Sequence, residues 1–267
     1  MPFPSAAAPL HLVVLMAMIT AIANQKGGTG KTTTALTLAA ALCEQGKFVL
    51  VVDMDPQGNI TSGLGVTHEE EQGVYAALSG VETKTLIRQT SVPCLDILSA
   101  GPELSGASIE LVDQPQREFR LRQALSEIRA NYDVILIDCP PTLGLLTLNA
   151  LVAADNVLIP VQCEYYALEG LGQLLRTIDL VKTRLQPSLE ILGAVMVMHD
   201  RRLKLSQDVV REVQQNFPYR VFETIVPRNV RLAESPSFGK SVYETAPWSK
   251  GAKSYKKLAE EFTALLP

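Results

Sequence analysis

The chain has 267 residues, a formal net charge of −4 and 47% hydrophobic residues. This composition predicts one large or two small folded α/β domains and argues against a disordered chain. The charge is uneven, because the stretch from His199 to the end holds 12 Lys and Arg against 8 Asp and Glu. That asymmetry permits a polyanionic partner. The cysteines at positions 43, 94, 139 and 163 match no metal or redox spacing, so we expect small buried residues in a reducing compartment.

The apolar stretch from Leu10 to Ala23 contains the first predicted strand. No Lys or Arg precedes Lys26, which disfavours a signal peptide, and the stretch is too short to span a bilayer. We interpret 18–23 as a buried strand and 1–15 as an extension outside the core, for which an amphipathic membrane contact is the alternative. Residues 16–267 are then expected to form one folded domain.

The remaining elements follow in alternation. Short apolar runs predict further buried strands at 48–52, 94–98, 134–137, 156–161, 191–198 and 221–226. Helical periodicity predicts helices at 32–45, 74–78, 86–89, 104–112, 117–132, 145–153, 166–185, 203–217 and 251–266, with a loop at 61–67. Strands that alternate with helices predict an α/β fold, with a mostly parallel twisted sheet covered by helices on both faces.

A glycine-rich turn follows the first strand and opens the first long helix. It reads Lys26-Gly27-Gly28-Thr29-Gly30-Lys31-Thr32-Thr33. Backbone N–H groups and a helix N-terminus in this order predict a phosphate cradle. Lys31 would reach the β- and γ-phosphates, and the Thr32 hydroxyl would bind Mg²⁺. Gln25 replaces the glycine of the strict phosphate-loop pattern, and Lys26 is an additional lysine that we expect to reach a nucleotide held by another copy.

Three carboxylates stand at the ends of predicted strands. Asp53 and Asp55 follow the second strand, and Asp138 follows the strand at 134–137. The carboxyl ends of parallel strands share one sheet edge, so these side chains should meet the glycine-rich turn. An NTPase needs a metal anchor and a group that orients water. Asp138 suits the first role, through a metal-bound water, and Asp55 suits the second. Any one carboxylate alone would more often be a helix cap or a surface charge.

These motifs give the chain a specific resemblance. It resembles the ParA/Soj-type chromosome or plasmid partition ATPases of the deviant Walker A class of P-loop ATPases. The resemblance rests on 24–34, 52–59, 138–141 and 147–151, and above all on two narrower stretches, 162–170 and Ile-Val-Pro-Arg-Asn-Val-Arg-Leu-Ala-Glu-Ser-Pro-Ser-Phe-Gly-Lys at 225–240. It implies an ATP-sandwich homodimer in which Lys26 contacts the opposite subunit's ATP, Lys31 contacts its own, and Asp55 drives hydrolysis. Pro227 and Asn229 match the loop that holds the adenine.

The resemblance also implies non-specific binding of double-stranded DNA by the ATP dimer. Arg202 and Arg231 match the family's DNA-contacting arginines, and Arg228 is a weaker match that could belong to the nucleotide loop. Slow intrinsic hydrolysis, stimulation by a ParB-like centromere-binding protein and a nucleoid-associated cytoplasmic location are further implications. The sequence itself shows basic residues between 201 and 257 and no helix-turn-helix, so binding should be phosphate-directed and salt-dependent.

Two alternative functions remain open at this point. One is a membrane-recruited positioning ATPase of the MinD kind, although the last predicted helix ends without a cationic rim and we expect no stable membrane binding. The other is a cargo-positioning ATPase that uses the nucleoid as a track. Asp-Cys-Pro-Pro at 138–141 makes an iron–sulfur role improbable. Because the glycine-rich turn begins this early, we expect no N-terminal operator-binding domain.

Overall fold

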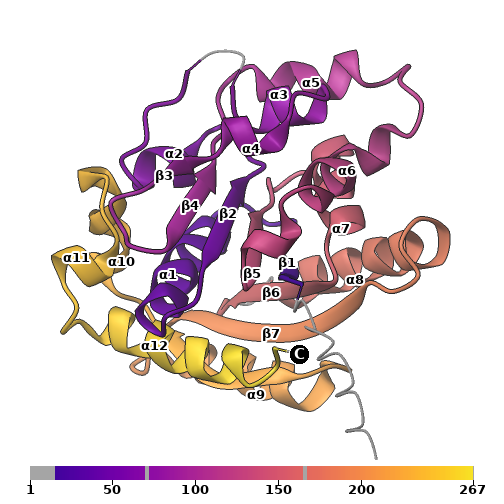
Figure 1. The fold of residues 1–267 in the computed structure, drawn as a ribbon. Coiled ribbons are helices and arrows are strands. Elements are labelled where there is room, and N and C mark those ends of the chain that lie inside the picture. Colours follow the sequence, from indigo (N-terminus) through magenta and orange to yellow (C-terminus); the bar gives the residue numbers. More distant parts are fainter. Residues whose placement is uncertain (1–15, 70–71, 165–166, 267) are drawn as a thin grey trace, which may run out of the picture.

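A mixed sheet of eight strands forms the centre of the computed structural model, which describes residues 16–69, 72–164 and 167–266 (Figure 1). The strand order is β3-β4-β2-β5-β1-β6-β7-β8, and every neighbouring pair is parallel except β3 and β4. The strands are β1 (Met18–Ile22), β2 (Val49–Asp53), β3 (Arg88–Gln89), β4 (Leu95–Leu98), β5 (Val134–Asp138), β6 (Asn156–Gln162), β7 (Glu190–His199) and β8 (Val221–Pro227).

Helices cover both faces of the sheet, as predicted. They are α1 (Lys31–Glu44), α2 (Asn59–Gly63), α3 (Val74–Leu78), α4 (Thr83–Leu86), α5 (Leu104–Glu110), α6 (Arg120–Ser126), α7 (Leu145–Ala153), α8 (Ala167–Arg184), α9 (Lys204–Asn216), α10 (Val230–Glu234), α11 (Val242–Thr245) and α12 (Lys250–Thr263). Short 3₁₀ turns lie at Arg117–Phe119, Arg129–Asn131 and Ser235–Phe238. The α/β fold class is therefore confirmed.

The sheet separates two hydrophobic layers. In β1, Ile19 and Ala21 face a layer that includes residues of α3 and α5 to α9, while Met18 and Ile22 face a layer formed by α1, α2 and α10 to α12. Strands buried on both faces are apolar throughout, which is why the short apolar runs located them correctly. No helix among the residues that the structure describes is long and apolar enough to cross a membrane.

Local expectations were wrong at three places. Residues 86–89 were expected to be helical, but β3 occupies Arg88–Gln89 and pairs antiparallel with β4 at the sheet edge. The expected loop at 61–67 begins inside helix α2. The expected helix at 117–132 is interrupted, with α6 between two 3₁₀ turns. In each case contacts with neighbouring elements override weak local propensity. The extension at 1–15 lies outside the described residues.

Candidate nucleotide-binding site

The three strand ends that carry the site are neighbours in the sheet. Strand β5 lies between β2 and β1, and Asp138 is in register with Asp53 on one side and with Ile22 on the other. The glycine-rich turn that follows β1 therefore lies next to Asp138, and the loop that follows β2 lies beyond it. The parallel order brings together carboxylates that are far apart in sequence, at the carboxyl edge where α/β proteins bind ligands.

Hydrogen bonds of Asn24 fix the start of the glycine-rich turn. Asn24 Oδ1 accepts a hydrogen bond from Lys26 N at 3.0 Å, and Asn24 Nδ2 donates to Pro160 O at 2.7 Å. Gly30 has a φ of 77°, a left-handed conformation that suits glycine, and it leads directly into α1. No side chain of the described residues caps this helix, so its first N–H groups are available to an anion.

Two lysines of the turn have different surroundings. Lys31 is buried and its Nζ donates to Lys26 O at 3.2 Å. Burial lowers the pKa of Lys31, and the negative charge of Asp138 opposes that effect. Lys26 points elsewhere: its Nζ lies 3.3 Å from Glu164 Oε2 in an ion pair that is partly exposed.

Glu164 is a residue that the sequence did not single out for a role. It follows β6 and pairs with two cations, Lys26 and Arg228, the latter at 3.7 Å through Oε1. Gln162 Nε2 donates to the same Oε1 at 2.6 Å. The only signal in the sequence is its position in Gln-Cys-Glu at the end of a buried strand. The structure thus connects the extra lysine of the glycine-rich turn with an arginine after β8.

The carboxylates beside the turn are buried to different degrees. Asp138 is fully buried, and neither of its carboxylate oxygens has a hydrogen-bond partner among the described residues. Burial and then the charge of Asp53 raise the pKa of Asp138, while Thr32 and Lys31 lower it. Burial also raises the pKa of Asp53 to about 6, against hydrogen bonds from Thr61 and Asp55 that lower it.

This arrangement fits a divalent cation. A buried carboxylate without donors is costly unless a cation or further hydrogen bonds compensate it. Asp138 and the Thr32 hydroxyl supply oxygen ligands of the kind that Mg²⁺ takes, either directly or through water. Asp55 is half-buried in the loop after β2, and its Oδ1 accepts a hydrogen bond from Gln57 N at 3.0 Å. The structure thus brings Lys31, Thr32, Asp55 and Asp138 to one edge, as predicted.

A mainly apolar cavity of about 180 Å³ lies beside the turn. Gly30 and Thr33 form one side, and its other lining residues come from the ends of β7 and β8, from α10 and from α12: Val197, Met198, Val226, Pro227, Arg228, Asn229, Leu232, Ala233 and Tyr255. Pro227 and Asn229, predicted to hold a base, both lie here. Asn229 also caps α10 by accepting from Arg231 N at 3.0 Å.

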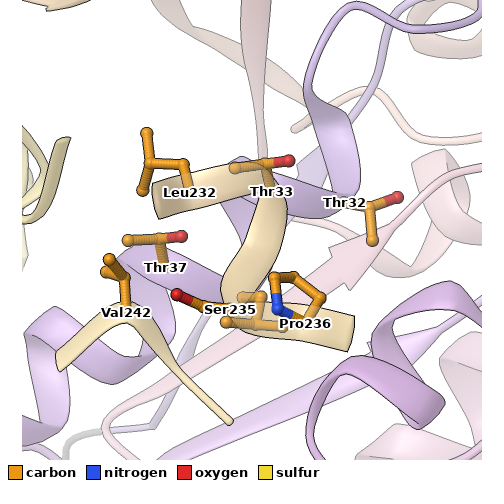
Figure 2. A pocket seen from close by; sticks show the side chains of 8 residues that line it. Thr32, Thr33, Thr37, Leu232, Ser235, Pro236 and Val242 are labelled. Atoms are coloured by element: carbon orange, nitrogen blue, oxygen red, sulfur yellow. The ribbon is translucent and has the colours of Figure 1, made fainter. Parts of the chain in front are cut away.

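A second, much smaller cavity lies between the first turns of α1 and the C-terminal segment. Figure 2 shows Thr33 and Thr37 of α1 facing Leu232 and Ser235 of the C-terminal segment. Its volume of about 30 Å³ holds about one water molecule, so it is a packing defect and not a ligand site.

A basic groove lies next to the apolar cavity. Its volume is about 730 Å³, and it is lined by His199, Asp200, Arg201, Arg202, Ile225, Pro227, Arg228, Val230, Lys250, Lys253, Ser254 and Lys257. Arg202 is largely exposed and pairs with Asp200 at 2.8 Å. The structure therefore brings Arg202 and Arg228 together with lysines of α12. Arg231 is outside the lining, on α10, and pairs with Glu234 at 2.9 Å.

The expectation that all four cysteines are buried was correct for only two of them. Cys139 and Cys163 are buried as expected, but Cys43 is half-buried and Cys94 is exposed. Cys94 lies in a tight turn at the edge of the sheet, with a φ of 64°. Within the described part of the chain, no group of three or more His, Cys, Asp or Glu side chains could hold a metal ion.

Known proteins resemble this chain over nearly its whole length. A family model described as AAA domain matches residues 17–191. The chain is 54% identical to "Chromosome partitioning protein ParA" of Myxococcus xanthus, over 91% of this chain and 87% of that protein. It is 52% identical to "Sporulation initiation inhibitor protein Soj" of Bacillus subtilis, over 93% and 99% of the two chains.

Solved structures share the fold. One is described as cobyrinic acid a,c-diamide synthase from Mycobacterium smegmatis with bound ADP and magnesium. It superposes with a TM-score of 0.82 at 38% identity, covering 93% of this chain and 94% of that one.

Proposed function

This chain belongs to the ParA/Soj family of partition ATPases, and we propose that it is an ATP-switched DNA-binding dimer. In this proposal two copies enclose ATP and Mg²⁺ between them, the dimer binds double-stranded DNA without sequence preference, and hydrolysis releases it. A ParB-like centromere-binding protein stimulates hydrolysis, whose intrinsic rate is slow. The observation that carries the proposal is that Lys31, Thr32, Asp55 and Asp138 converge at one sheet edge while Lys26 is directed away from its own turn.

The roles of the residues follow from their positions. Gly27, Gly28, Thr29, Gly30 and Thr33 surround the phosphates with backbone N–H groups, and buried Lys31 neutralises their charge. Thr32 and, through a water, Asp138 would hold Mg²⁺, which when bound offsets phosphate charge. Asp55 orients and polarises the attacking water. Lys26 leaves Glu164 and reaches the ATP of the other subunit, so dimer formation requires nucleotide.

The apolar cavity suits the adenine. Its volume of about 180 Å³ and its lining by Pro227, Asn229, Met198 and Tyr255 support a planar base next to the glycine-rich turn. The solved relative described with bound ADP and magnesium supports the same type of ligand. We accordingly propose ATP and Mg²⁺ as the cofactors of one ATPase domain, residues 16–267.

The basic groove is the proposed DNA-binding surface. Arg202, Arg228 and the lysines of α12 gather positive charge around one concave surface, and Arg231 lies next to it on α10. Contacts of this kind are made with phosphates, so they carry no sequence preference and weaken with salt. A dimer would present two grooves, which explains how ATP could switch DNA affinity. The resulting location is cytoplasmic and nucleoid-associated.

The sequence relatives favour partition over the alternatives. Identity to the two partition-family proteins is 54% and 52%, against 38% to the diamide synthase, so the latter name has weaker support. A membrane-recruited ATPase would need an amphipathic anchor, but Tyr255, Leu258 and Phe262 of α12 are buried against the sheet. A cargo other than DNA remains compatible with the same site.

Co-sedimentation tests the proposal directly. The purified chain is mixed with a non-specific DNA duplex, or with anionic lipid vesicles, in the absence of nucleotide, with ADP and with ATP plus Mg²⁺. We expect the chain to sediment with DNA only when ATP plus Mg²⁺ is present. We expect it not to sediment with vesicles under any of the three conditions. Binding to vesicles without binding to DNA would refute the proposal, and so would DNA binding that ignores the nucleotide.

A further inference from the structure

Asp53 is a fully buried carboxylate that accepts three hydrogen bonds, one from the loop that follows it and two from helix α2. Oδ1 accepts from Asp55 N at 3.2 Å, and Oδ2 accepts from Thr61 N at 3.0 Å and from Thr61 Oγ1 at 2.7 Å. One carboxylate thus ties the backbone of Asp55 to helix α2. The two branches use different oxygens, so each branch depends on its own acceptor.

The loop between Asp53 and Thr61 is also fixed from outside. Thr61 Oγ1 accepts from Ala100 N at 3.0 Å, which connects Asp53 through Thr61 to the chain after β4. Gly58, with a φ of 59°, comes so close to this segment that a Cβ would lie 2.9 Å from Ala100 O. A glycine is therefore required there, and the loop has little freedom once Asp53 and Thr61 are bonded.

Asp138 makes the contrast clear. It is in register with Asp53 on the neighbouring strand, yet its oxygens have no partner among the described residues. Asp138 is free to serve a ligand, whereas every oxygen of Asp53 is occupied by the protein. The two buried carboxylates therefore have different tasks.

We infer that Asp53 is a positioning residue for ATP hydrolysis: its carboxylate holds the loop that aims Asp55. This inference rests on the proposed function, because it presupposes that Asp55 acts on the attacking water. A small displacement of such a group reduces the rate of the chemical step while leaving the binding of the nucleotide largely intact. Asp53 itself touches neither substrate nor metal in this role.

The first test is Asp53→Asn in the full chain. Asparagine keeps one oxygen and replaces the other by an NH₂ group, so it can serve only one of the two branches. We expect kcat for ATP to fall about tenfold or more, with KM changed less than about threefold. Amide exchange followed by mass spectrometry, without nucleotide, should become at least about fivefold faster in 54–61.

A matched pair at Thr61 tests the second branch. Thr61→Val removes the hydroxyl that bridges Asp53 and Ala100, and we expect kcat to fall about three- to tenfold at unchanged KM. Thr61→Ser keeps the hydroxyl and should stay within about twofold of the unmodified protein. Asp96→Asn is the control, since this carboxylate on β4 accepts from Tyr132 Oη at 2.9 Å away from the site.

The outcomes separate the inference from the proposed function when Asp55→Ala is measured alongside. Absence of ATP hydrolysis in the unmodified protein would overturn both. If Asp55→Ala abolishes ATP hydrolysis while Asp53→Asn changes kcat by less than about twofold, the inference is overturned and the proposed function stands. A merely structural role would move kcat, KM and Tm together, which also contradicts it. If Asp53→Asn fails to fold, equal kcat values for Thr61→Val and Thr61→Ser refute the inference, and rescue by serine supports it.

Discussion

Single side chains at the carboxyl edge of the sheet differ in what surrounds them. Lys31 is buried and bonded to its own turn, whereas Lys26 is partly exposed and paired with Glu164. A partly exposed ion pair of this kind contributes only about 0–1 kcal/mol, so it can be exchanged at little cost for contacts with a polyphosphate. In the proposed dimer, the second subunit's nucleotide would therefore displace Glu164 from Lys26 at little cost.

Lys26→Ala should prevent the ATP-dependent dimer. A hydrogen bond to a charged group contributes about 2 kcal/mol, and the dimer contains two such contacts, so the loss is about 4 kcal/mol, or roughly a thousandfold in dimer affinity. Asp55→Ala should instead retain the dimer, because ATP is bound but not hydrolysed. Size-exclusion chromatography with light scattering in ATP measures both.

Lys47→Ala is the control for this pair, since Lys47 lies before β2 at the opposite edge of the sheet. A dimer that survives in Lys26→Ala would show that the nucleotide is not held across the subunits. A monomeric Asp55→Ala protein would contradict the role given to hydrolysis.

At the scale of elements, α1 and α12 pack on the same face of the sheet. A buried hydrogen bond joins them, between Thr34 Oγ1 and Tyr255 Oη at 2.9 Å. Tyr255 also lines the apolar cavity, and α12 supplies lysines to the basic groove. The phosphate helix and the basic surface are therefore coupled through one helix pair.

Tyr255→Phe should lower the free energy of unfolding by about 1–2 kcal/mol, because it leaves the buried Thr34 hydroxyl without its partner. For a chain of this size the melting temperature should fall by about 2–8 °C. Thermal unfolding followed by circular dichroism measures the effect. The double variant with Tyr255→Phe and Thr34→Val should lose less free energy of unfolding than the sum of the two single variants, since both partners of the hydrogen bond are then removed together. Strict additivity would show that the hydrogen bond is not formed.

The whole molecule has a polarised charge distribution. The net charge of −4 hides a basic C-terminal part, and the structure places six of its twelve Lys and Arg residues around one groove between β8 and α12. Two such grooves in a dimer would bind DNA much more tightly than one. The number of phosphate contacts sets the salt dependence, so the slope of log K against log salt should be about twice as steep for the dimer as for a monomer.

Changing Arg202 and Arg231 together to alanine should abolish DNA binding at physiological salt and leave the ATP-dependent dimer intact. Each lost phosphate contact reduces the salt slope by about one. Filter binding across a salt series measures the slope, and light scattering measures the dimer. Arg184→Ala, on α8 and away from the groove, is the control. Undiminished affinity in the double variant would place the DNA on another surface.

Much of the architecture follows from local pattern. Buried strands are continuous apolar runs, and the glycine-rich turn requires a strand before it and a helix after it, so the fold class and the phosphate cradle were predictable. Edge strand β3 and helix α2 were not, because their short segments have weak propensity. Pairing with the following strand β4 stabilises β3, and the hydrogen bond between Ala100 N and Thr61 Oγ1 connects α2 to a segment distant in sequence.

The sequence by itself determined which residue types meet at the carboxyl edge, since parallel order follows from alternating strands and helices. Only the tertiary structure decided how they divide their tasks. It left both carboxylate oxygens of Asp138 without a hydrogen-bond partner among the described residues, bonded Asp53 to Thr61, and paired Lys26 with Glu164. These outcomes depend on which atoms lie within hydrogen-bonding distance across neighbouring strands. Spacing along the chain does not contain that information.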